Sequence, residues 1–376
     1  MSPILFALYI NGLADEIKKA GISGAKIVIS REERCGILMF ADDIVLIAES
    51  REDLQRLMEI TMDYSHMWRF SFNYDKCAVV IFDNKVGGDI KYGPCKESCD
   101  CGFHWKLGNK LIKQETSYKY LGMELDTRLS QKEFKKRICS KAKASLSRVW
   151  RMGMRYGSLT VKASINLYEA LVRSVLEYGA AVWTNKEWKE GERVQREMGR
   201  RILRCHGKTT NEAVLGELGW WKLQTRRAFL KLKYWIKLSL MDNSRLVRKV
   251  YLMSRDAYLN QRKKNWSYGV HALIIKYELR ELWRDENRIK HPAALPHNEH
   301  TERRLRKYWE RMLFKKIQEV EEREWKEEME RKPKLRTYRS FKRNLELERY
   351  LLSEKEKTGR YLLTKLRVGT KLRRGD

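Results

Sequence analysis

The sequence predicts an α+β protein in which a small antiparallel sheet with packed helices comes first and a long all-helical part follows. Near the N-terminus, two apolar runs flank a pair of adjacent aspartates, which indicates a hairpin of core strands. From Gln131 onward, apolar side chains recur with the 3.6-residue period of amphipathic helices. A chain of 376 residues is long enough for two or three domains.

The predicted hairpin covers residues 37–47 and bends at Asp42 and Asp43. Two neighbouring carboxylates repel one another and are costly to desolvate on an apolar hairpin. A divalent cation removes that cost, and Mg²⁺ readily takes carboxylate oxygens together with substrate phosphates. The Asp-Asp pair alone also fits an ordinary solvated turn, so the rest of the chain decides between the two interpretations.

Other local signals surround this hairpin. A helical pattern covers residues 3–20, with an apolar stripe made of Leu5, Phe6, Leu8, Tyr9, Leu13 and Ile17. Ser50, with Asp53 three residues later, resembles a capping box for a helix that runs to about Trp68. Strands are expected at residues 25–30 and 78–82, and a hairpin is expected about Gly108-Asn109.

The helical part carries further start and stop signals. Thr160 is expected to cap one helix, another should stop at Gly207, and residues 209–212 form a capping box for a third. A long charged helix before Pro333 carries a narrow apolar stripe of Leu305, Tyr308, Trp309, Met312, Leu313, Ile317 and Val320. That stripe fits a solvated spacer and a coiled-coil partner equally well.

The charge is unevenly distributed. Residues 1–100 hold 12 basic and 16 acidic side chains, whereas the remaining residues hold 67 basic against 33 acidic ones. This asymmetry favours nucleic acid as the partner of the helical part and not an anionic membrane, because the aromatic residues are not confined to one amphipathic anchor. Most tryptophans in these helices are expected to fill helix–helix seams and not to stack on bases, namely Trp183, Trp188, Trp220, Trp221, Trp235, Trp266, Trp283, Trp309 and Trp325.

The cysteine usage and the lack of long apolar runs limit the compartment. Seven cysteines without regular spacing fit a reducing intracellular location, nuclear or cytoplasmic, and no run of 18 apolar residues suggests a membrane span. Cys95, Cys99, Cys101 and His104 follow a C-x3-C-x-C-x2-H pattern. Zinc knuckles normally pair cysteines two residues apart, so a variable hairpin with free thiols is favoured over a zinc site.

Four segments in order resemble the palm of reverse transcriptases from non-LTR (LINE-type) retrotransposons. They are Ser-Pro-Ile-Leu-Phe at residues 2–6, Phe-Ala-Asp-Asp at 40–43, Asn-Tyr-Asp-Lys at 73–76 and Tyr-Leu-Gly at 120–122. The resemblance implies an RNA-directed DNA polymerase that uses Mg²⁺ and acts on an RNA template and a DNA primer or target. It implies metal ligation by Asp42 and, more weakly, by Asp43.

The resemblance also assigns roles to other residues. Lys76 is expected near the leaving pyrophosphate as a general acid or electrostatic aid, although its position also fits a surface lysine. The segment 118–122, with the turn of Tyr120, Leu121 and Gly122, supports the primer strand in the family. Independently of the resemblance, the excess of basic residues predicts that the helix beginning near Gln131 binds nucleic-acid phosphates, and the side chains assigned to this are Lys132, Lys135, Lys136, Arg137, Lys141 and Lys143.

The same resemblance predicts how the chain is organised. We expect a partial palm (1–128), a thumb-like helical block (129–206), a basic helical region (207–290), a linker (291–300) and a charged helical region (301–376). Because the family's first metal-binding aspartate and fingers precede the matched segments, the chain is expected to be a fragment with negligible polymerisation of its own. A non-catalytic RNA- or DNA-binding remnant is the alternative, and the oligomeric state is left open.

Overall fold

The computed structural model describes residues 3–22, 24–26, 34–82, 104–155, 158–183, 186–293, 301–352 and 357–369. The chain divides into two units, Met1–Phe134 and Lys135–Asp376, each with its own hydrophobic core. The finer division into five segments stays a prediction. Most of the expected linker, residues 294–300, lies outside the described residues.

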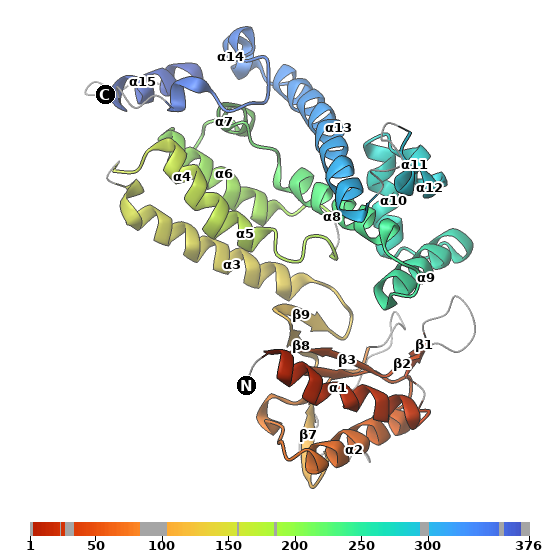
Figure 1. Ribbon diagram of the computed structural model, residues 1–376. Helices are drawn as coiled ribbons and strands as arrows, with labels where there is room; N and C mark the ends of the chain where they lie inside the picture. The colour runs from red at the N-terminus through yellow and green to blue at the C-terminus, as the bar shows by residue number, and fades with distance from the viewer. Residues whose placement is uncertain are drawn as a thin grey trace. The chain divides into compact units, whose positions relative to one another are not determined.

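The first unit alternates short strands with two long helices (Figure 1). In chain order its elements are α1 (Pro3–Lys19), β1 (Ala25–Lys26), β2 (Arg34–Cys35), β3 (Ile37–Phe40), β4 (Asp43–Leu46), α2 (Arg51–Met67), η1 (Tyr74–Lys76), β5 (Ala78–Val79), β6 (Trp105–Leu107), β7 (Lys110–Gln114), β8 (Ser117–Tyr120) and β9 (Met123–Asp126). Four antiparallel pairs form, β1–β2, β3–β4, β6–β7 and β8–β9, and β5 adds to β7 in parallel. The mixed α+β character and the antiparallel hairpins predicted for this region are therefore confirmed.

Helix α1 packs on α2 through Ile10, Leu13 and Ile17, which are almost fully buried with Leu57. The predicted apolar stripe of α1 is partly wrong, because Leu5 and Leu8 are 59% and 69% exposed. At about 100° per residue, Leu8 lies about 140° around the helix from the buried Leu13 and Leu5 about 80° from it. In α2 the predicted cap is confirmed, since the Ser50 hydroxyl accepts a hydrogen bond from the Asp53 amide at 3.0 Å.

The second unit is helical throughout its described residues. Its elements, beginning with the helix that leads into it, are α3 (Lys132–Val149), η2 (Trp150–Met154), α4 (Val161–Tyr168), η3 (Glu169–Arg173), α5 (Ser174–Leu176), α6 (Lys189–Leu203), α7 (Asn211–Leu218), α8 (Leu223–Leu240), α9 (Leu246–Gln261), α10 (Trp266–Lys276), α11 (Arg280–Arg284), α12 (Asn287–Lys290), α13 (Glu302–Glu330), η5 (Pro333–Leu335), α14 (Arg336–Phe341), η6 (Arg349–Leu352) and α15 (Lys357–Arg367). The predicted all-helical part is confirmed.

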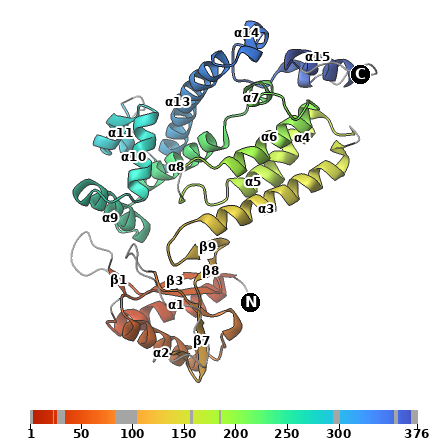
Figure 2. The ribbon, with the colours of Figure 1, turned by 180° about the vertical axis from the view of Figure 1, so that it is seen from behind.

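Helix α8 lies at the centre of this unit and contacts α6, α9, α10, α12 and α13. The two opposite ribbon views show α13 crossing beside it (Figures 1 and 2). Most of the α13 stripe is buried in the same core as Leu232 and Trp235 of α8, although Met312 is 44% exposed, so this long helix is a packed core element and not a solvated spacer. Eight of the nine tryptophans named above are buried, and Trp266 is half-buried, which confirms that they fill seams.

Two of the predicted helix ends are wrong. Helix α6 ends at Leu203, and its C-cap Arg204 takes the left-handed conformation with φ +50°, three residues before Gly207. Thr210 caps α7 without a side-chain hydrogen bond, so the capping box over residues 209–212 does not form. The Glu212 carboxylate instead pairs with Lys332 at 2.7 Å, a contact between distant segments that a local motif cannot anticipate. Thr160, in contrast, caps α4 as predicted, because its hydroxyl accepts from the Ala163 amide at 3.1 Å.

Candidate active site

The aspartate pair lies at the hairpin between β3 and β4, with the turn one residue earlier than predicted. Met39 pairs with Ile44 and Phe40 with Asp43, which leaves Ala41 and Asp42 as the two-residue turn. Both carboxylates are exposed, while the strands behind them contribute Met39, Ile44 and other apolar side chains to the core beside α1 and α2. The apolar hairpin therefore holds two carboxylates at its tip, open to a ligand.

Ala41 adopts a left-handed backbone with φ +53° at this tip. Such a conformation costs a residue with a Cβ roughly 1 kcal/mol, a cost that glycine avoids. We expect Ala41→Gly to raise the free energy of unfolding of the first unit by about 0.5–1 kcal/mol. Ala7→Gly, on the exposed face of α1, is the matched control and should lower it by about 1 kcal/mol. Chemical denaturation would measure the change in the free energy of unfolding for both variants. A destabilised Ala41→Gly variant would contradict the left-handed conformation at this turn.

A second tight turn joins β8 to β9. Its central residues Leu121 and Gly122 both have positive φ, +43° and +77°, as the primed hairpin turns require. Glycine satisfies this at the second position without steric cost. The Tyr-Leu-Gly motif thus has a conformational reason, and it fixes the tip of the hairpin whose first strand carries Tyr118 and Tyr120.

Strand β8 carries residues that interact with two other sequence motifs, the aspartate hairpin and the lysine segment at residues 73–76. Tyr118 and Tyr120 are two residues apart on one strand and therefore share a face. Burial raises the pKa of both phenols, and the nearby negative charge of Asp43 raises them further; for Tyr118 the Cys77 thiol contributes as well. The Tyr118 hydroxyl donates a hydrogen bond to the backbone carbonyl of Lys76 at 2.7 Å. Tyr118 thus connects the aspartate hairpin with the lysine segment.

Tyr118 belongs to the segment 118–122 that is expected to support the primer strand, but the sequence predicts no separate role for it. The only signal available was its two-residue spacing from Tyr120, which places both phenols on one face. Lys76 ends the short helix η1, with its side chain exposed and its carbonyl used by Tyr118. The roles of Asp42, Asp43, Lys76 and the Tyr120 turn remain predictions, but these residues belong to one neighbourhood and not to separate surfaces.

The donor set of the hairpin suits a hard divalent cation. Asp42 and Asp43 supply carboxylate oxygens only, and Mg²⁺ is commonly held by one or two carboxylates together with substrate phosphates and water. Among the residues that the structure describes, no group of three or more Asp, Glu, His or Cys side chains comes together as a metal cluster. Cys95, Cys99 and Cys101 lie outside these residues, so the choice between zinc and free thiols at that segment stays open.

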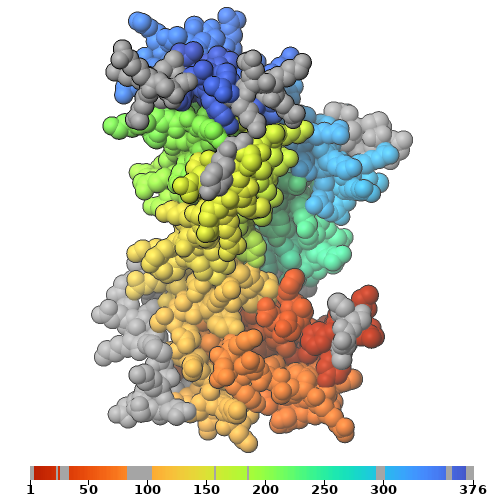
Figure 3. Space-filling model, turned by 90° about the vertical axis from the view of Figure 1, so that its left-hand side faces the viewer, coloured from red at the N-terminus to blue at the C-terminus, as the bar shows by residue number. Residues whose placement is uncertain are grey.

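Helix α3 presents its basic side chains in two strips. At about 100° per residue, Lys132, Lys136 and Lys143 fall within an arc of about 40°, and all three are exposed. Lys141 is exposed on a different side of the helix, close to the half-buried Arg137. Figure 3 shows a side of the chain on which the yellow segment that contains α3 reaches the surface.

Lys135 differs from its neighbours. Its side chain is half-buried, with its ammonium 5.5 Å from the centre of the Trp183 ring. Burial and the positive charge of Arg227 lower its pKa. Lys135 therefore packs on an aromatic ring and is less available for phosphate contact than the three exposed lysines.

Comparisons with known proteins show what the chain is similar to. Residues 1–125 match the reverse transcriptase (RNA-dependent DNA polymerase) family. The chain is 27% identical over 161 residues to an RNA-directed DNA polymerase from mobile element jockey of Drosophila melanogaster, an alignment covering 40% of this chain and 16% of that protein. It is 22% identical over 192 residues to the jockey polymerase of Drosophila funebris, covering 49% and 18%. No solved structure matches.

The extent of these matches is limited. The chain spans less than a fifth of the length of both relatives, so it corresponds to one part of each polymerase. The family match covers the first unit up to β9, including both tight turns and the lysine segment. Within the described residues, no helix combines the length and the apolar character needed to cross a bilayer.

Proposed function

We propose that this chain, whose residues 1–125 match the reverse transcriptase family, contributes the catalytic hairpin and a nucleic-acid-binding helical part to RNA-directed DNA synthesis by a LINE-type retrotransposon polymerase. The observation that carries the proposal is the meeting of three motifs at β8. Burial and the charge of Asp43 raise the pKa of Tyr118 and Tyr120, and Tyr118 bonds to the backbone of Lys76. A solvated Asp-Asp turn would need none of these neighbours.

The proposed roles follow from the chemistry of each group. Asp42, at the turn, is a direct ligand of Mg²⁺, and Asp43 is a second oxygen donor that also faces the tyrosines. The ion, when bound, lowers the pKa of the primer hydroxyl and neutralises charge on the phosphates. Lys76 is a candidate proton donor or electrostatic aid for the leaving pyrophosphate. The partners are an RNA template and a DNA primer or target.

A binding experiment tests the hairpin. The affinity of the chain for an RNA-template–DNA-primer duplex would be measured with and without Mg²⁺ at constant ionic strength. Wild type is expected to bind more tightly with Mg²⁺, and Asp42→Asn and Asp43→Asn are expected to lose that gain. Asp63→Asn, an exposed aspartate of α2, is the matched control and should keep it. An Mg²⁺ response that survives Asp42→Asn would contradict the proposal.

The second candidate function is nucleic-acid binding without catalysis, supported by the excess of basic residues beyond residue 100 and the exposed strip on α3. It expects affinity that falls with salt and does not change in Asp42→Asn. The same titration separates the two candidates, because only the polymerase proposal links binding to Mg²⁺ through the aspartates.

A charge-removal variant tests the strip on α3. Lysines that neutralise phosphates release counterions from the nucleic acid. For each phosphate that the protein no longer neutralises, the slope of log affinity against log salt concentration becomes less steep by about 0.7–0.9. Lys132→Gln/Lys136→Gln/Lys143→Gln is therefore expected to reduce the slope by about 2. The control removes three exposed lysines elsewhere, Lys307→Gln/Lys315→Gln/Lys334→Gln. Equal changes in both triple variants would show that only net charge matters and not the strip.

A further inference from the structure

A small cavity in the second unit lies apart from every residue discussed above as a site. Its volume is about 270 Å³, and side chains from α4, α6, the α7–α8 connection, α8 and α13 form its walls. Sites for small molecules have volumes of roughly 300–1,000 Å³. With a volume just below this range, the cavity can hold one flat ring system but not a folded chain segment.

Aromatic rings form much of the wall. Tyr168 and Trp220 stack with ring centres 4.4 Å apart and an angle of 23° between their planes. Trp221 lies 4.7 Å from Phe314, whose side chain is 44% exposed although it belongs to the core-packing helix α13. An exposed phenylalanine at the edge of an aromatic wall offers a face on which another ring can stack.

Two buried polar atoms in the wall lack partners. The Tyr168 hydroxyl and Gln195 Oε1 make no hydrogen bond to any residue that the structure describes, although Tyr168 is 1% and Gln195 2% exposed. Gln195 is held in place because its amide nitrogen donates to the Trp221 carbonyl at 2.7 Å. Burial raises the pKa of Tyr168, so its hydroxyl stays protonated and can donate. The cavity thus presents one free donor and one free acceptor, and leaving such groups unsatisfied is costly.

The charges at the cavity are already balanced. Arg226 pairs with Glu177 at 2.8 Å, and Arg173 pairs with Glu169 at 2.6 Å. The two arginines that line the cavity are thereby neutralised, so it does not suit an isolated phosphate or carboxylate. A neutral, flat, hydrogen-bonding group fits its walls better than an anion.

From these walls we propose that the cavity receives one unpaired nucleobase of a bound strand, stacked on Phe314 and hydrogen-bonded to Tyr168 and Gln195. The inference rests on the proposed nucleic-acid partner and adds a site for a single base to it. Base–aromatic stacking tolerates any sequence, because every base has a π-face. The cavity therefore takes a splayed-out base without selecting a template.

The test uses two probes that differ by one base. One is a ten-residue DNA strand of abasic tetrahydrofuran units with a single central 2-aminopurine, and the other is the fully abasic strand. Wild type is expected to prefer the base-containing strand by about fivefold or more, and to quench its fluorescence by stacking. Phe314→Ala and Tyr168→Phe are expected to bring the ratio of the two affinities close to one. The control variants Met312→Ala and Tyr268→Phe, at exposed positions of α13 and α10, should leave this ratio unchanged.

The results distinguish misfolding of a variant, absence of the base site and absence of nucleic-acid binding. Tyr168→Phe removes a hydroxyl that has no bonding partner among the described residues, so thermal unfolding should show equal or higher stability and exclude misfolding as the cause of weaker binding. The base site would be overturned if wild type bound both strands with equal affinity. It would also be overturned if the preference for the base-containing strand survived both Phe314→Ala and Tyr168→Phe. Failure to bind either strand at low salt would overturn the nucleic-acid partner as well.

Discussion

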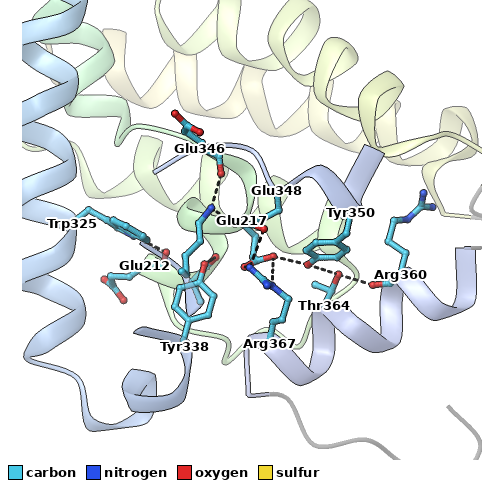
Figure 4. Close-up of polar contacts among 12 residues, drawn as sticks. Glu212, Glu217, Trp325, Tyr338, Glu346, Glu348, Tyr350, Arg360, Thr364 and Arg367 are labelled. Atoms are coloured by element: carbon cyan, nitrogen blue, oxygen red, sulfur yellow. Dashed lines mark hydrogen bonds and ion pairs between the residues drawn. The ribbon is translucent and has the colours of Figure 1, made fainter. Parts of the chain in front are cut away.

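Replacing Glu217 by glutamine is expected to lower the free energy of unfolding of the second unit by about 3–5 kcal/mol. Glu217 of α7 is fully buried, and its two oxygens accept hydrogen bonds from Arg367 of α15 at 3.0–3.1 Å and from the Tyr350 hydroxyl at 2.5 Å (Figure 4). Losing the carboxylate removes the main counter-charge of Arg367 and leaves the guanidinium only Glu348, 3.1 Å away. The cost is that of the weakened charge pairing and of a buried amide nitrogen that cannot accept the hydrogen bonds the carboxylate accepted.

Matched variants separate this effect from general disturbance. Glu346→Gln, an exposed glutamate in the same region, should change stability by no more than about 0.5 kcal/mol. Glu217→Gln/Arg367→Met should regain part of the stability, because it also removes the guanidinium that has lost its main partner. Urea denaturation followed by tryptophan fluorescence would measure all three. A decrease below about 1 kcal/mol in Glu217→Gln would contradict the buried pair that joins α15 to α7.

Replacing Lys231 by methionine is expected to stabilise the second unit at pH 7 by about 3 kcal/mol. Lys231 of α8 is only 2% exposed, and burial together with the charge of Arg227 one turn earlier lowers its pKa to about 8. The ordinary value of 10.5 applies when the chain is unfolded. Below pH 8 both states carry the proton, so the folded state bears the full cost of the buried charge.

The pH dependence of this gain gives the sharper test. Between about pH 8 and 10.5 the unfolded chain holds a proton that the folded chain has released, so wild-type stability rises with pH over this range. The advantage of Lys231→Met should shrink over the same range and vanish above it. Lys233→Met, at a half-exposed lysine paired with Glu310, is the control and should not give the stabilisation at pH 7. Destabilisation by Lys231→Met at pH 7 would contradict the account.

Local features of this fold could be predicted from the sequence because local forces determine them. The bend at Asp42-Asp43, the hairpin about Gly108 and the caps at Ser50 and Thr160 each depend on residues within a few positions of one another. The periodicity of apolar residues and the residue types at turns indicate such short-range preferences directly. The α13 stripe was visible too, but its burial against α8 was not, because a stripe does not name its partner.

Contacts between distant segments could not be predicted. Tyr118 reaches Lys76 across 42 residues, and Arg367 reaches Glu217 across 150. The error in the α1 stripe has the same origin, since only the position of α2 decides that Leu13 is buried and Leu8 exposed. Charge composition predicted a polyanion partner but could not distinguish Lys135, which packs on Trp183, from the exposed lysines of its helix.

Iron-directed cleavage tests the central claim most directly, namely that the Asp42-Asp43 hairpin holds a divalent ion beside Lys76 and the β8–β9 turn. Fe²⁺ would replace Mg²⁺ on the chain bound to a primer–template duplex, and ascorbate with peroxide would generate radicals that cut the nearby backbone. We expect cuts close to Asp42, Lys76 and Tyr118, which disappear in Asp42→Asn/Asp43→Asn and persist in Asp63→Asn. Cuts that survive removal of both aspartates, or that cluster away from all three segments, would contradict the account.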